Sequence, residues 1–204
     1  MSSSSTDHTL EKICLPVEAT VDYYPNFITS EEATALFSVI SQYASLEDNR
    51  LTVHGVSFDF GKVSFIDKEL KETDAIPEAG HGKTMVWPEA LLEIRQRIET
   101  LLNKIYRVCI CIYYPDGNSG VDFHADRPSF GDTTVIASIS LGAERQFLLR
   151  HKVTGEQHGL VLKHGSLLVM GEGCQDHYEH SLPVDSTCEN PRINLTFRQF
   201  GYEE

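Results

Sequence analysis

The sequence predicts an α+β fold, in which a double-stranded β-helix (jelly-roll) core carries N-terminal helices packed outside. Two observations lead to this class. From residue 106 onward, short β-rich runs alternate with turn residues, whereas the first half of the chain carries helix signals. The length of 204 residues and the hydrophobic content of 41% support one domain with a sizeable core. We assign residues 1–12 to a disordered, serine-rich tail and residues 13–204 to that domain.

The helix signals lie in two places. Thr29 and Glu32 form a capping box before apolar residues at helical spacing. A second helix is predicted to begin at Pro88, and its apolar side carries Leu91, Ile94, Ile98, Leu101, Leu102 and Ile105. Residues 45–85, between the two helices, are polar and dotted with glycine, so we expect a lid-like substrate-recognition segment there.

Six β-rich runs follow the second helix. They are Val108–Tyr114, Thr134–Leu141, Gln146–Arg150, Gly159–Leu162, Ser166–Met170 and Arg192–Phe200. Cys109 and Cys111 share one face of the first run and are predicted to be buried as small hydrophobic residues. The five cysteines lack a zinc-like CxxC spacing, and the N-terminus lacks an export signal. We therefore expect a reducing compartment, the cytoplasm or the nucleus.

The chain is acidic, with a formal net charge of −13. This charge argues against a broad basic surface for phosphate backbones. Residues 45–85 hold five basic and eight acidic residues, so phosphate contacts in this segment would be few and local. No apolar run reaches the ~18 residues of a membrane helix, and we expect a monomer without a membrane partner.

The segment Asp122-Phe-His-Ala-Asp126 offers two strong metal ligands, His124 and Asp126, separated by one residue. On an extended segment, residues two apart point the same way, so both side chains can meet one metal. His180 is the third candidate, because a double sheet gives the chain room to return beside its start. Two histidines and one carboxylate form the facial triad of non-haem Fe(II) oxygenases. A zinc hydrolase is an alternative use of this set, and a surface histidine is the alternative for His124.

The run Arg192-Ile-Asn-Leu-Thr-Phe-Arg198 places alternate polar side chains on one face of a strand, namely Arg192, Asn194, Thr196 and Arg198. The residues between them, Ile193, Leu195 and Phe197, then belong to the core. Two guanidinium groups on a buried face are costly unless carboxylates meet them. The alternative is an edge strand with solvated arginines.

These motifs resemble the signature of the AlkB family of Fe(II)/2-oxoglutarate dioxygenases. The resemblance rests on His124-x-Asp126, His180 and the Arg192–Arg198 run. It covers residues 106–201 in order and also takes in the segments Tyr114–Gly117, Ile136–Gly142, Arg145-x-Phe147, His164–Leu168 and His177–Pro183.

The resemblance implies an oxidoreductase that uses Fe(II), 2-oxoglutarate and O₂ to oxidise a substrate C–H bond. An oxidised N-methyl group leaves as formaldehyde, so the implied activity is demethylation of an N-alkylated nucleobase in DNA or RNA, as in DNA repair. The implied metal ligands are His124, Asp126 and His180. The implied contacts to 2-oxoglutarate are Tyr114, Arg192, Asn194 and Arg198. The candidate substrate contacts are Lys62, Phe65 and Arg127.

Two positions depart from the family pattern. Ile112 stands where the family has an asparagine, which removes one expected hydrogen bond to 2-oxoglutarate unless Tyr113 or another group replaces it. Arg127 stands where the family's repair enzymes carry acidic residues, and a cation there would repel a positively charged methylated base. Three hypotheses remain: a nucleobase demethylase, the same chemistry on a small molecule or a protein side chain, and a non-catalytic or differently metallated binding domain.

Overall fold

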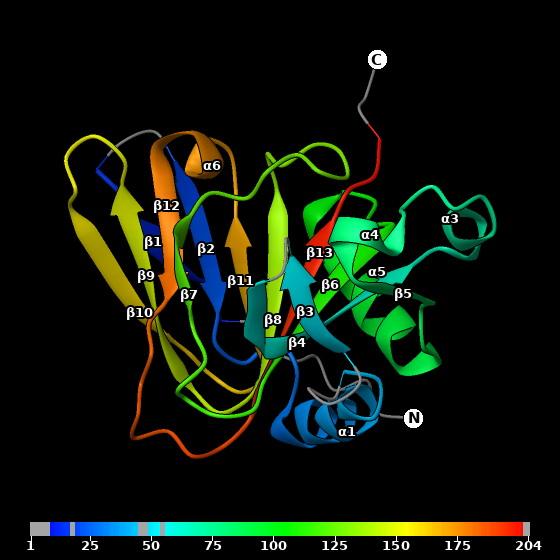
Figure 1. The fold of residues 1–204 in the computed structure, drawn as a ribbon. Coiled ribbons are helices and arrows are strands. Elements are labelled where there is room, and N and C mark those ends of the chain that lie inside the picture. The colour runs from blue at the N-terminus through cyan, green and yellow to red at the C-terminus, as the bar shows by residue number, and fades with distance from the viewer. Residues whose placement is uncertain (1–8, 17–18, 45–48, 54–55, 202–204) are drawn as a thin grey trace, which may run out of the picture.

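The structure is a computed structural model, and it describes residues 9–16, 19–44, 49–53 and 56–201. Two β-sheets face each other, and the longer helices pack on the outer side of the larger sheet (Figure 1). Within these ranges, no helix is long and apolar enough to cross a membrane.

The larger sheet follows the order β1-β2-β11-β8-β13-β6-β4-β3, with β5 paired to β4. The β4–β5 pair is parallel, and the remaining pairs are antiparallel. In chain order its strands are β1 (Glu11–Cys14), β2 (Thr20–Tyr24), β3 (Arg50–Val53), β4 (Val56–Ile66), β5 (Lys83–Val86), β6 (Val108–Tyr114), β8 (Ile136–Gly142), β11 (Ser166–Met170) and β13 (Arg192–Arg198).

The smaller sheet follows the order β10-β9-β12-β7, with all pairs antiparallel. Its strands are β7 (Val121–His124), β9 (Arg145–His151), β10 (Gln157–Leu162) and β12 (Tyr178–Leu182). The two facing, mostly antiparallel sheets confirm the predicted jelly-roll core. The six runs predicted from the sequence do not include β7 and β12, because both strands are short and carry polar residues where strand formers would be expected.

Helix α1 (Ser30–Ser41) begins at the predicted capping box, where each of Thr29 and Glu32 donates its backbone N–H to the other's side chain. Helix α5 (Glu89–Leu102) follows Pro88 and ends where Asn103 adopts a left-handed conformation. Ile105, predicted for the apolar side of this helix, therefore lies beyond its end and is 69% exposed. The shorter helices are α3 (Lys68–Glu72), α4 (Glu78–His81) and α6 (Cys174–His177).

The larger sheet has an apolar core on each face. The first core packs its outer face against α1 and α5, and it contains Cys109 and Cys111 fully buried, as predicted. The second core lies between the sheets, where Phe147 meets Leu168 and Met170. These three residues also border the cavity described below. The site is therefore built on the inner face of a sheet whose outer face is fixed by helices.

Two segments differ from the sequence prediction. Glu11 and Lys12, assigned to the tail, belong to β1, because β2 offers them an antiparallel partner. Much of the segment 45–85, expected to form a lid, is sheet: β4 pairs with β6 from Gly61 to Ile66 and extends the larger sheet. Residues 1–8, 45–48 and 54–55 lie outside the described ranges.

Phe65, a predicted substrate contact, lies in the helix-side core. It is 0% exposed, and its ring meets the Tyr43 ring edge-on at a centroid distance of 6.0 Å. Strand alternation turns Phe65 toward the helices and Phe58 and Phe60 toward the opposite face of β4. The prediction that Phe65 contacts a substrate is therefore wrong.

Replacing Phe65 with alanine is expected to lower the free energy of unfolding by about 3–5 kcal/mol, because a buried ring is lost and a cavity remains. Phe58→Ala on the same strand is the matched control; its ring is 38% exposed. The control is expected to lose less than about 1 kcal/mol. Urea unfolding curves measure both values, and equal losses would place Phe65 outside the core.

Candidate metal centre

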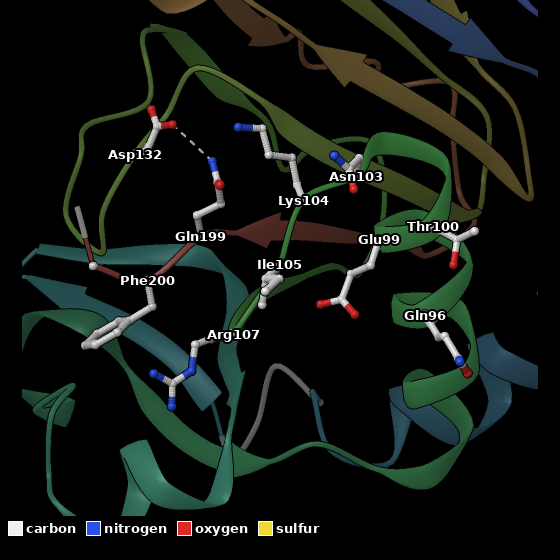
Figure 2. A pocket seen from close by; sticks show the side chains of 11 residues that line it. Gln96, Glu99, Thr100, Asn103, Lys104, Ile105, Arg107, Asp132, Gln199 and Phe200 are labelled. Carbon is white, nitrogen blue, oxygen red and sulfur yellow. Dashed lines mark hydrogen bonds between the residues drawn. The ribbon is translucent and has the colours of Figure 1, made fainter. Parts of the chain in front are cut away.

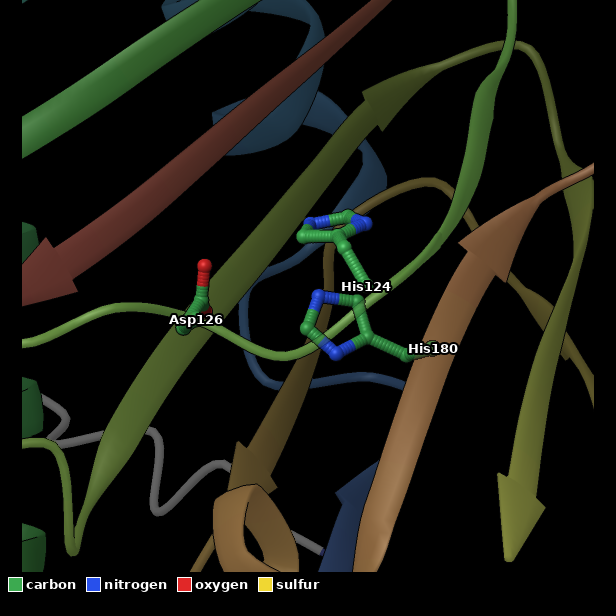
Figure 3. A group of neighbouring side chains, drawn as sticks. All are labelled: His124, Asp126 and His180. Carbon is green, nitrogen blue, oxygen red and sulfur yellow. The ribbon is translucent and has the colours of Figure 1, made fainter. Parts of the chain in front are cut away.

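The three predicted ligands meet where β7 and β12 pair (Figure 3). The ligand atoms of His124, Asp126 and His180 all lie within 4.8 Å of one another. His124 and His180 are direct cross-strand partners, and their ring centroids are 4.3 Å apart. The segment that leaves β7 then carries Asp126 to the same place. The structure therefore brings together the three side chains that the sequence predicted as metal ligands.

A hydrogen bond orients the ring of His124, and burial favours the neutral form of His180. His124 Nδ1 lies 2.8 Å from the carbonyl oxygen of Asp122, so Nδ1–H donates and Nε2 keeps its lone pair. Burial lowers the pKa of His180 to about 4, although the nearby carboxylate of Asp126 acts in the opposite direction. The neutral imidazole is the metal-binding form.

Asp126 is held from two directions. Its backbone N–H donates to the Gln175 side chain at 2.8 Å, and its carboxylate lies 3.3 Å from the Arg198 guanidinium. Arg198 is buried and also donates to the backbone carbonyl of Arg127 at 2.7 Å. The structure thus places Arg198 against a metal ligand, and Arg198 is not among the residues that line the cavity described next. No sequence signal pointed to Gln175.

A cavity of about 110 Å³ lies beside the three candidate ligands, between the two sheets. The larger sheet lines it with Tyr114, Ser138, Arg192, Asn194 and Thr196. On β13, the residues between and after Arg192, Asn194 and Thr196 are buried in the helix-side core. This confirms the predicted alternation of the strand. Because β13 is flanked by β8 and β6, the alternative of an edge strand is wrong.

Arg192 is a buried cation in the wall of this cavity, with 2% of its surface exposed. Its Nη2 donates to the Ser140 hydroxyl at 2.9 Å and to Asn194 Oδ1 at 3.2 Å, whereas its Nε has no hydrogen-bond partner. Burial lowers the pKa of Arg192 to about 10, and no carboxylate among the described residues pairs with it. Such a guanidinium is suited to bind an anion that enters the cavity.

Arg145 organises the loops beside the site, a role that the sequence did not predict. It is 1% exposed, and its guanidinium donates at 2.6–3.4 Å to the backbone carbonyls of Asp116, Gly117, Ser119 and Pro183. These carbonyls belong to the loop that enters β7 and to the loop that leaves β12. Arg145 therefore fixes both strands that carry the histidines. The Arg145-x-Phe147 motif had singled out Arg145 in the sequence, but the motif did not indicate what the side chain does.

The two departures from the family pattern lie at different places. Ile112 lines the cavity, and Tyr113 packs into the helix-side core, so Tyr113 does not replace the missing asparagine. Lys62 is the cross-strand partner of Ile112 and is half-buried. Arg127 is exposed directly after Asp126.

A larger cavity, of about 610 Å³, lies between the ends of α5 and β13 (Figure 2). Three of its charged groups have partners: Glu99 pairs with Arg95, Arg107 forms two ion pairs, and Asp132 accepts from Gln199. None of the predicted site residues lines it. The chemistry of the sequence motifs therefore belongs to the smaller cavity between the sheets.

A family model described as the 2OG-Fe(II) oxygenase superfamily matches residues 20–198. This chain belongs to that superfamily. The match contains all three candidate ligands and every residue of the cavity wall named above.

Relatives of this 2OG-Fe(II) oxygenase confirm the resemblance to the AlkB family. The chain is 36% identical over 122 residues to the alpha-ketoglutarate-dependent dioxygenase alkB homolog 3 of Mus musculus. It is 34% identical over 122 residues to the DNA oxidative demethylase ALKBH2 of Homo sapiens. Each match covers 55% of this chain, but only 43% and 47% of the two relatives. The matched part thus spans less than half the length of either relative.

Two solved structures share the fold of this oxygenase. OsALKBH1 superposes with a TM-score of 0.62 at 14% identity, covering 93% of this chain and 100% of that one. A prolyl-4-hydroxylase from Pseudomonas putida gives a TM-score of 0.55 at 15% identity, covering 88% and 92%. At these identities the likeness concerns the fold alone.

The donor set and the cavity fit the groups that the superfamily name implies. Two imidazoles and one carboxylate suit Fe(II) and leave coordination positions open. The unpartnered Nε of the buried Arg192 suits a carboxylate of 2-oxoglutarate.

Replacing His180 with alanine is expected to weaken Co(II) binding by more than about 100-fold, beyond the loss typical of changes outside the ligand set. Absorption titration of the purified variants with Co(II) measures this affinity. His177→Ala, at an exposed position of α6, is the matched control and should bind Co(II) as the unchanged protein does. Full Co(II) affinity in His180→Ala would exclude His180 from the ligand set.

Proposed function

We propose that this chain is an Fe(II)- and 2-oxoglutarate-dependent dioxygenase that demethylates N-alkylated nucleobases in DNA or RNA. The observation that carries the proposal is the set of His124, Asp126 and His180 beside a cavity lined by Arg192, a buried cation with no carboxylate partner among the described residues. The names of the relatives, which include a DNA oxidative demethylase, support the same reaction. The five free cysteines suit a reducing compartment, the cytoplasm or the nucleus.

In this proposal, each side chain of the site has a distinct task. His124, Asp126 and His180 hold the iron, which together with 2-oxoglutarate and O₂ supplies the oxidising power for a substrate C–H bond. Arg192 neutralises a carboxylate of 2-oxoglutarate. Arg198 holds the Asp126 carboxylate in place through their ion pair. The oxidised N-methyl group leaves the base as formaldehyde.

Hydrogen bonds between its own side chains fix the polar wall of the cavity. Asn194 Oδ1 accepts from the Ser138 hydroxyl at 2.8 Å, and its Nδ2 donates to the Thr196 hydroxyl at 2.7 Å. Apolar side chains, among them Phe147 and Leu182, line the remaining wall and exclude water. The wall is therefore preorganised for a small dicarboxylate.

A groove of about 770 Å³ adjoins His124 and offers a place for the base. Phe58 and Phe60 line it, with ring centroids 5.2 Å apart, and Phe58 is partly exposed. Aromatic rings at such a place suit stacking with a nucleobase taken out of its helix. Trp87, by contrast, is buried and stacks on Phe197 in the helix-side core.

A second candidate is the same oxidation on a small molecule or a protein side chain. The net charge of −13 and the exposed Arg127 beside Asp126 favour it, because they disfavour polyanions and cationic bases respectively.

Replacing Arg192 with lysine is expected to weaken binding of N-oxalylglycine, a stable analogue of 2-oxoglutarate, by about 1.5–3 kcal/mol. The charge remains, but the planar fork that pairs with a carboxylate is lost. Calorimetric titration of the Co(II)-loaded protein measures the affinity. Arg97→Lys serves as the control, because Arg97 lies on α5, pairs with Glu32 and does not line the cavity. Unchanged affinity in Arg192→Lys would remove Arg192 from the carboxylate site.

The proposed activity is tested with methylated oligonucleotides, methylated small amines and methylated peptides. We expect succinate and formaldehyde in equal amounts with at least one methylated oligonucleotide, and no formaldehyde with its unmethylated counterpart. Formaldehyde formed only from amines or peptides would favour the second candidate. Absence of succinate with every substrate, in the Fe(II)-loaded protein, would contradict the dioxygenase itself.

A further inference from the structure

Of the four lysines between residues 56 and 85, a carboxylate neutralises Lys68 and Lys71, whereas Lys83 is exposed and Lys62 is half-buried. Lys68 pairs with Glu72 at 3.5 Å, and Lys71 pairs with Glu78 at 2.9 Å. Lys62 forms no ion pair with any described residue. Burial and the charge of Arg198 both disfavour its protonated form. Lys62 is thus a cation whose environment supplies no counter-charge.

The surroundings of Lys62 disfavour its charge. The side chain is half-buried beside Gly82, where a Cβ atom would lie 3.7 Å from its Cγ and Cδ. Burial lowers the pKa of Lys62, and the guanidinium of Arg198 lowers it further. Lys62 in turn lowers the pKa of His81, after the larger effect of burial. A desolvated ammonium among cations is unfavourable unless an anion joins it.

Arg127 is a second cation without a carboxylate partner among the described residues, and it directly follows Asp126 in the chain. Its backbone carbonyl accepts from Arg198 Nη2 at 2.7 Å, so its position beside Asp126 is fixed while its side chain is exposed. Arg198 therefore contacts the Arg127 backbone, and its charge also acts on Lys62. Asp126, the carboxylate nearest to Arg198, is already assigned to the metal.

We propose that Lys62 and Arg127 bind the phosphate of the nucleotide whose base is oxidised; this inference rests on the proposed function. Lys62 shares a face of β4 with Phe60, which lines the groove for the base. Two residues along a strand separate their Cα atoms by roughly 7 Å, a distance suited to the span from a base to its phosphate. Both cations then meet an anion.

The proposal also gives a role to the exposed Arg127 beside the metal ligand Asp126. A cation there repels a cationic base but attracts the phosphate of the nucleotide that contains the base. It also reconciles the net charge of −13 with a nucleic-acid substrate, because two local contacts suffice and no broad basic surface is required.

The first experiment measures binding of an unmethylated, fluorescently labelled single-stranded oligonucleotide as a function of salt. Two phosphate contacts predict a log–log slope of about −1.4, and loss of one contact predicts about −0.7. Lys62→Gln and Arg127→Gln should each show the smaller slope. Lys62→Arg keeps the charge and should keep the slope of the unchanged protein. Lys68→Gln, which removes an already paired exposed lysine, should also keep it.

The second experiment compares turnover of a methylated nucleoside with that of its 5′-monophosphate. Lys62→Gln and Arg127→Gln should each raise KM for the nucleotide about tenfold, equivalent to about 1.4 kcal/mol. The kcat for the nucleotide and the KM for the nucleoside should stay near those of the unchanged protein. This selectivity separates a phosphate contact from general damage to the fold.

Three results would overturn the assignment. One is an unchanged salt slope in both glutamine variants. Another is an equal rise in KM for nucleoside and nucleotide. The third is weaker N-oxalylglycine binding in Lys62→Gln, which would place the ammonium on 2-oxoglutarate in place of the asparagine that Ile112 replaces. If the unchanged protein oxidises no methylated base, the proposed function fails, whereas the salt slopes still decide whether the two cations bind phosphate.

Discussion

The antiparallel pairing of β7 with β12 is the contact on which the rest of the site depends. It sets His124 directly opposite His180, and the chain leaving β7 then brings Asp126 to the same point. Because β7 is four residues long and lies at the edge of its sheet, it needs support from outside its own ladder. Arg145 gives that support by binding carbonyl groups of the loops at the ends of both strands.

The three buried arginines of the site make different kinds of contact. Arg145 donates to backbone carbonyls and therefore acts on the shape of the loops, whereas Arg198 meets Asp126 and acts on a metal ligand. Arg192 has hydroxyl and amide partners but no carboxylate, so its charge is left for a ligand. Burying a cation without a counter-charge is costly, and an anionic cosubstrate at this place would offset that cost. The buried charge of Arg192 therefore lowers the stability of the fold and strengthens the binding of an anion.

Much of the site could be predicted from the sequence, because its signals are local. Alternation along the Arg192–Arg198 strand and the ligand chemistry of the HxD motif depend only on residues close in the chain. The roles of Gln175 and Arg145 depend on which loops meet in the folded protein, and no local pattern records that. Phe65 shows a subtler limit: alternation separates it from Phe58, but only the folded sheet shows which face of β4 meets the helices. The short strands β7 and β12 lacked strand signals because they carry polar residues, and two of these polar residues are the histidines of the site.

The central claim is that one iron and one 2-oxoglutarate bind together at the cavity between the sheets. Visible absorption under strictly anaerobic conditions tests it most directly, because 2-oxoglutarate chelated to Fe(II) produces a charge-transfer band that neither component gives alone. We expect this band to appear only when both are added, to saturate at one iron per chain, and to vanish when N-oxalylglycine displaces 2-oxoglutarate. A protein that binds both components but shows no such band would contradict the account.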